Sequence, residues 1–66
     1  MNVSELRTEL ILLMYDAIKK ALKEDDELPQ DQKKYFVRKF KDWKYTVDLF
    51  EAELNKRNVD YERIIW

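Results

Sequence analysis

The 66-residue chain contains no cysteine, no histidine and no glycine. Without cysteine there is no disulfide, no thiolate nucleophile and no cysteine-based zinc site. Without histidine the chain lacks the commonest general base and the commonest metal ligand. Phosphate-cradling loops and β-hairpins are also disfavoured, because both rely on the freedom of glycine at positive φ. We therefore expect neither an enzyme nor a protein that uses a metal or another cofactor.

An excess of charge of one sign and long apolar runs are missing as well. The 13 basic and 14 acidic residues give a formal net charge of -1, so the overall charge selects neither a nucleic acid nor a membrane. The longest apolar run, Leu10–Tyr15, is far shorter than the ~20 residues of a membrane span. No leader pattern of basic, apolar and small residues is recognisable. These features predict a soluble, cytoplasmic protein without a membrane partner.

The clearest pattern is an apolar repeat in the second half of the chain. Its residues recur at alternating steps of four and three, which is typical of the a/d seam of a helix. The seam consists of Phe36, Phe40, Trp43, Val47, Phe50 and Leu54. It predicts one long helix over residues 29–57, with Pro29 in the first turn. Asn58 would end this helix at the left-handed C′ position, and Val59 would close back onto Leu54 as in a Schellman cap.

A first helix is predicted over about residues 3–23, opened by Asn2 as the N-cap and followed by an acidic connection over 24–28. Two apolar stripes wind along this helix and together cover roughly 200°, which is more than a helix with one neighbour needs. The first stripe is Val3, Leu6, Leu10, Leu13, Ala17 and Ala21, and the second is Ile11, Met14, Ile18 and Leu22. A last helical turn is predicted over residues 60–65.

Two helices joined by a short connection are expected to be antiparallel neighbours. When the first stripe faces the seam of the long helix, apolar residues lie opposite one another in six layers. The pairs are Val3 with Leu54, Leu6 with Phe50, Leu10 with Val47, Leu13 with Trp43, Ala17 with Phe40, and Ala21 with Phe36. The predicted fold class is therefore all-α, an antiparallel helical hairpin with a short C-terminal helical turn.

The second stripe of the first helix would stay uncovered in such a hairpin. A core from so short a chain rarely supplies more than ~3–5 kcal/mol, and no disulfide or metal supplements it here. We therefore expect a homodimer in the form of a dimeric four-helix bundle. Its predicted interface consists of Ile11, Met14, Ile18 and Leu22. The alternative is a monomeric three-helix bundle in which the last segment folds back over this stripe.

Several tyrosine, arginine and apolar residues lie outside the seam. Such residues, exposed together, are typical of protein-binding surfaces. The predicted partner-binding residues are Tyr35, Arg38, Tyr45, Leu49, Leu12 and Trp66. For Trp66 the alternative role is a lid over the open end of the bundle.

A cluster of basic residues near the start of the long helix offers an alternative partner. Lys34, Arg38 and Lys41 would form one stripe on that helix and could contact a nucleic acid. The carboxylates of the acidic connection lie among these residues and would repel phosphate. They also lack the ligand spacing and central glycine of a calcium-binding loop.

The sequence as a whole predicts a non-enzymatic protein–protein interaction module, a regulator, inhibitor or adaptor that acts through a helical surface. The first alternative is a small nucleic-acid-binding protein that uses the basic end of the hairpin. The second alternative is a purely structural oligomer.

Overall fold

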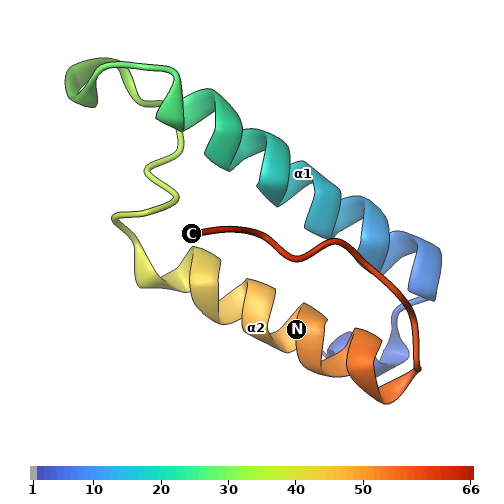
Figure 1. Ribbon diagram of the computed structural model, residues 1–66. Helices are drawn as coiled ribbons and strands as arrows, with labels where there is room; N and C mark the ends of the chain where they lie inside the picture. The colour runs from blue at the N-terminus through green and yellow to red at the C-terminus, as the bar shows by residue number, and fades with distance from the viewer. Residues whose placement is uncertain (1) are drawn as a thin grey trace.

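The computed structural model describes residues 2–66 and contains helices but no strand within that range. Its two α-helices are α1 (Thr8–Asp26) and α2 (Lys41–Lys56), and a short 3-10 turn precedes each of them, η1 (Val3–Glu5) and η2 (Gln30–Gln32). The two α-helices run side by side in opposite directions (Figure 1). The predicted all-α helical hairpin is therefore confirmed. Neither helix of the described chain combines the length and the hydropathy that crossing a membrane requires.

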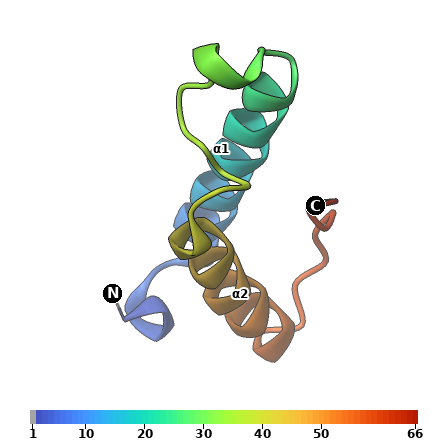
Figure 2. The same ribbon diagram turned by 90° about the vertical axis from the view of Figure 1, so that its left-hand side faces the viewer.

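The C-terminal residues Val59–Trp66, which we call the strap, run back along the hairpin in an extended conformation. In the view of Figure 1 the strap follows the line between α1 and α2 and ends near the start of α2. Figure 2 places it on the opposite side of the helix pair from η1. The predicted helical turn over 60–65 is therefore wrong. The strap is too short to be a stable helix on its own, and its main chain hydrogen-bonds to the hairpin instead, from the N–H of Ile64 to the hydroxyl of Tyr15.

The buried core lies between the two helices and under the strap. From α2 it takes Val47, Phe50 and Leu54, all of which belong to the predicted seam. The complete set of buried apolar residues is Val3, Ile11, Tyr15, Ile18, Ala21, Leu22, Val37, Val47, Phe50, Leu54 and Ile64. The seam was thus predicted correctly for its C-terminal half.

The face of α1 that packs against this core differs from the prediction. Leu13 is 67% exposed and Leu10 and Ala17 are exposed too, so the predicted layers that contain them are not formed. The second stripe is buried instead, with Ile11 fully covered and Ile18 nearly so. Both stripes of α1 are apolar, so periodicity alone could not decide which one faces α2. The strap decides it, because Ile64 adds apolar cover to one side only.

This burial also bears on the predicted dimer interface. Ile11, Ile18 and Leu22 are buried and Met14 is half-buried within a single chain. In the structure this stripe faces α2, and it joins Val47, Phe50 and Leu54 in one buried core together with Ile64 of the strap. The reason for expecting a second copy at this stripe therefore no longer holds, and the oligomeric state stays a prediction.

The helix α1 begins at Thr8 rather than at residue 3 because its first turn is tied to the end of α2. The guanidinium of Arg57 donates hydrogen bonds to the carbonyls of Val3 and Ser4, at 3.4 and 3.2 Å, and to the hydroxyl of Thr8 at 3.1 Å. A continuous helix would direct these carbonyls to N–H groups four residues further on. The predicted cap from Asn2 does not form, since its side chain accepts a hydrogen bond from Ser4 instead.

The predicted single long helix is wrong for the residues before Lys41. After η2 the chain forms a loop, in which Phe36 adopts a positive φ of 53°, and α2 begins only at Lys41. The carboxylate of Asp25 accepts hydrogen bonds from the main-chain N–H groups of Lys34, Tyr35 and Val37. These donors are therefore not available for helical hydrogen bonds. The acidic connection predicted over 24–28 belongs mostly to the last turn of α1.

The end of α2 follows the prediction closely. Asn58 adopts a left-handed φ of 58°. The N–H of Val59 donates to the carbonyl of Leu54 at 3.0 Å, and that of Asn58 donates to Asn55 at 3.1 Å. These two bonds define a Schellman motif, so the predicted stop signal is confirmed. The motif also reverses the chain direction and sends the strap back along the hairpin.

Candidate functional site

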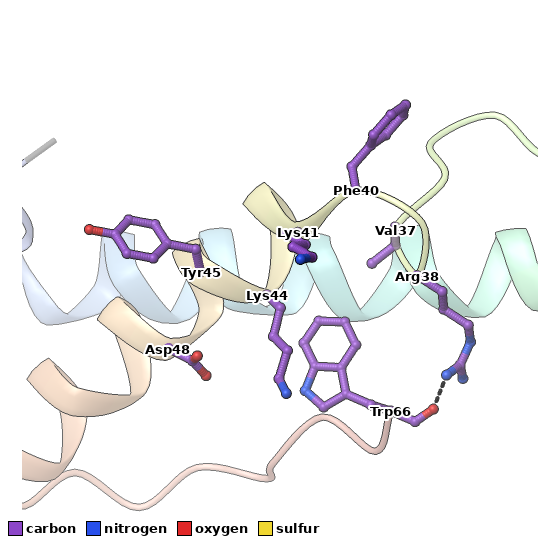
Figure 3. Close-up of a pocket in the computed structure, with 8 residues that line it drawn as sticks. All are labelled: Val37, Arg38, Phe40, Lys41, Lys44, Tyr45, Asp48 and Trp66. Atoms are coloured by element: carbon purple, nitrogen blue, oxygen red, sulfur yellow. Dashed lines mark hydrogen bonds between the residues drawn. The ribbon is translucent and has the colours of Figure 1, made fainter.

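An open groove lies beside the first turns of α2, between that helix and the end of the strap (Figure 3). Its volume is about 500 Å³, and its lining is mainly apolar. Ligand-binding clefts typically measure roughly 300–1,000 Å³, and the volume of the groove falls within that range. The lining residues are Val37, Arg38, Phe40, Lys41, Lys44, Tyr45, Asp48 and Trp66. We refer to it as the α2 groove.

Three aromatic side chains surround the groove and come from three different segments. Phe40 belongs to the loop and is 52% exposed, whereas Tyr45 belongs to α2 and is 66% exposed. Trp66 belongs to the strap and is half-buried. Figure 3 shows that the indole of Trp66 points toward α2, while the rings of Phe40 and Tyr45 extend outward on other sides of the groove. This arrangement leaves a large area of aromatic surface in contact with water.

The charged side chains of the groove fall into two groups. Arg38 is already neutralised, because its guanidinium forms two hydrogen bonds of 2.9 Å with the carboxylate of Asp26. The hydrogen bond from Arg38 lowers the pKa of Asp26 and, reciprocally, raises that of Arg38. Lys41 and Lys44 are exposed and have no carboxylate within 4 Å in the described part of the chain. The groove therefore carries two cationic groups that no anion in residues 2–66 compensates directly.

The strap wall of the groove is held by a buried tyrosine. The hydroxyl of Tyr15 donates to the carboxylate of Glu51 at 2.7 Å and accepts from the N–H of Ile64 at 2.9 Å. Burial, and then the hydrogen bond to Glu51, raise the pKa of Tyr15 well above its ordinary value. Tyr61 packs edge-on against Tyr15, with ring centroids 5.4 Å apart. A second tie near the end of the strap runs from the Arg38 guanidinium to the main-chain oxygen of Trp66.

The loop wall of the groove is held by Asp25, a residue that is only 2% exposed. Burial opposes the ionisation of Asp25, but the N–H groups of Val37, Tyr35 and Lys34 and the charge of Lys33 together hold its pKa below the ordinary value. The ammonium of Lys33 also donates to the main-chain carbonyl of Asp25. These bonds set the position of Val37 and Arg38, and through them the start of the groove.

The structure gathers three of the predicted partner-binding residues around the groove, namely Arg38, Tyr45 and Trp66. Tyr35 lies elsewhere, edge-on to Trp43 with ring centroids 6.4 Å apart. Leu12 and Leu49 are half-buried and pack against the core, so they offer little free surface.

Phe40 was missed as a groove residue because its place in the apolar repeat assigned it to the core. The repeat continues across the loop without interruption, so hydrophobic spacing alone could not show that the helix is broken there. A polar signal did exist in the acidic residues that precede Pro29. Their ability to bind main-chain N–H groups is a known property of aspartate in loops and turns.

The predicted nucleic-acid stripe is not formed as one helical face. Lys34 and Arg38 lie in the loop before α2, and only Lys41 belongs to the helix. Arg38 is also paired with Asp26. Within residues 2–66 no group of acidic side chains is arranged to hold a metal ion.

Comparisons of the chain with protein-family models, with curated proteins and with solved structures found no match in any of the three. The functional interpretation consequently depends on the geometry and chemistry of the α2 groove.

Proposed function

We propose that this protein is a non-enzymatic protein–protein interaction module that binds its partner through the α2 groove. The observation that carries the proposal is the exposure of Phe40 and Tyr45 beside Trp66 in one groove. Aromatic residues are enriched at protein interfaces and supply much of the binding energy there. A role as a regulator, inhibitor or adaptor follows, since a chain of this size would act by occupying a surface of its partner.

The construction of the groove favours binding over catalysis. Its walls come from the loop, α2 and the strap, which are tied together by Asp25 and Tyr15 rather than left to form on contact. A preformed site loses less conformational entropy when a partner binds. The polar groups of the groove are lysines, an arginine and an aspartate, with no histidine or cysteine in the chain to act as a base or nucleophile.

A peptide library tests this proposal directly. Random peptides displayed on phage would be selected on the wild-type protein, and each enriched peptide would then be tested on Tyr45→Ser and Leu13→Ser. Both substitutions remove an exposed apolar side chain, but only Tyr45 lines the groove. We expect enriched peptides that bind the wild type and Leu13→Ser equally and bind Tyr45→Ser at least tenfold more weakly. A selection that yields no peptide sensitive to Tyr45→Ser would overturn the proposal.

A further inference from the structure

The charge of the α2 groove indicates which kind of segment it accepts. We infer that the occupant is an acidic stretch of a partner protein that carries a large apolar side chain. The apolar side chain would lie against Phe40, Tyr45 and Trp66, and the flanking carboxylates would pair with Lys41 and Lys44. This inference rests on the proposed function and adds the chemistry of the partner to it.

The electrostatic part of the inference depends on which charged side chains of the groove already have an ion-pair partner within the chain. The guanidinium of Arg38 forms a bidentate ion pair with the carboxylate of Asp26, which balances its charge. Lys41 and Lys44 have no such partner in residues 2–66, and the single carboxylate in the lining, Asp48, lies beyond ion-pair distance of both. Counted with Asp26 and Asp48, the three basic side chains of the groove leave an excess of one positive charge, although the whole chain has a formal net charge of -1. Complementary charge across an interface selects partners and speeds their association.

The start of α2 adds to this positive character. Phe40 occupies the N-cap position and provides no side-chain hydrogen bond to the first turn of the helix. The free N–H groups of a helix N-terminus carry partial positive charge and favour nearby carboxylates. Lys41, the first residue of α2, lines the groove at this point. The first turn also contains the carboxylate of Asp42, so the preference for an anionic occupant rests mainly on Lys41 and Lys44.

The apolar part of the inference depends on the exposed aromatic surface. Burial of an aliphatic or aromatic side chain away from water contributes favourably to binding. Aromatic walls that remain this exposed in the free protein can gain that contribution only from an apolar group of the occupant. A nucleic acid could stack its bases on the same rings, but its backbone repeats a negative charge at every nucleotide, whereas the groove offers only two unpaired lysines. Two lysines beside aromatic rings match a short acidic peptide with one large apolar side chain better than a phosphate backbone.

The first test is the composition of the selected peptides that are sensitive to Tyr45→Ser. We expect aspartate and glutamate to be enriched, and lysine and arginine depleted, around one conserved apolar position relative to the unselected library. Peptides that depend on Tyr45 but show no acidic enrichment would overturn the inference and leave the proposed function intact. The absence of any Tyr45-dependent peptide would instead overturn the proposed function itself.

The second test uses the best acidic peptide, resynthesised with a fluorescein label and measured by fluorescence anisotropy. The double variant Lys41→Gln/Lys44→Gln should bind it about tenfold more weakly, because two exposed ion pairs are lost. The control Lys23→Gln/Lys56→Gln makes the same change of charge at exposed positions outside the groove and should have little effect. Equal losses in both double variants would show that only net charge matters and would overturn the inference. So would stronger, Lys41- and Lys44-dependent binding of a twelve-nucleotide oligothymidylate, which would identify the groove as a nucleic-acid site.

Discussion

The carboxylate of Asp25, in the last turn of α1, accepts a hydrogen bond of 3.1 Å from the main-chain N–H of Val37, twelve residues further along the chain. The same carboxylate binds the N–H groups of Lys34 and Tyr35. One side chain therefore takes up three main-chain donors and prevents the helix that the apolar repeat predicts at this point. The break places Val37 in the core and Phe40 at the rim of the groove.

Replacement of Asp25 by alanine should destabilise the protein more than any other single change in its acidic segment. Three main-chain donors would lose their acceptor, and an unpaired buried donor is costly. We expect the thermal midpoint to fall by roughly 10 °C for a domain of this size. Circular dichroism measures this shift, and Asp31→Ala, at an exposed position in η2, is the matched control. An equal effect of both substitutions would show that Asp25 has no special role.

The stability should also depend on pH through Asp25. Its pKa is lowered in the folded protein, so its contribution is complete above the unfolded pKa of about 3.9 and is lost as the pH falls through the folded value. The difference in thermal midpoint between the wild type and Asp25→Asn should therefore be constant near neutral pH and shrink under acidic conditions. Thermal melts across this pH range measure it. A difference that grows on acidification would contradict the predicted sign.

Removal of the Tyr15 hydroxyl should loosen the strap. In Tyr15→Phe the N–H of Ile64 loses its acceptor and Glu51 loses a donor, at a cost of about 1–3 kcal/mol for the buried groups. Hydrogen exchange of the Ile64 amide, followed by NMR, should become faster than in the wild type, and the increase should exceed that of amides in α1. The matched control is Tyr45→Phe, which removes a hydroxyl from an exposed ring. Unchanged protection of Ile64 in Tyr15→Phe would show that packing alone holds the strap.

The oligomeric state can be tested through the concentration dependence of unfolding. Ile11 and Ile18 are buried within a single chain, so the stripe that was expected to form the dimer interface does not need a second copy to cover it. We therefore expect the thermal midpoint to stay constant between micromolar and millimolar protein, because mass action affects only a folding equilibrium coupled to association. A midpoint that rises with concentration would support the homodimer, and its interface would then have to include a face other than the buried stripe.

The candidate site was only partly accessible from the sequence. Tyr45 and Trp66 could be singled out because aromatic residues outside an apolar seam need an explanation, and the structure brings both to the groove. Phe40 could not be singled out in this way, because its spacing fits the apolar repeat and the sequence does not distinguish it from a core residue. Leu49 was assigned to the surface from the same geometry, yet it packs against the core.

The sequence by itself determined the helical class, the core positions Val47, Phe50 and Leu54, and the end of α2 at Asn58. These features depend on local properties: a repeat within one helix, and a residue that tolerates positive φ. Only the tertiary structure decided which stripe of α1 is buried, where α2 begins and how the strap runs. The buried stripe depends on which face of α1 finds apolar neighbours in other segments. The start of α2 and the course of the strap depend on a competition between helical hydrogen bonds and a distant side chain. Asp25 accepts hydrogen bonds from N–H groups of the loop, and Tyr15 accepts one from Ile64. These partners are far apart in the sequence, so the apolar periodicity of a single helix cannot reveal them.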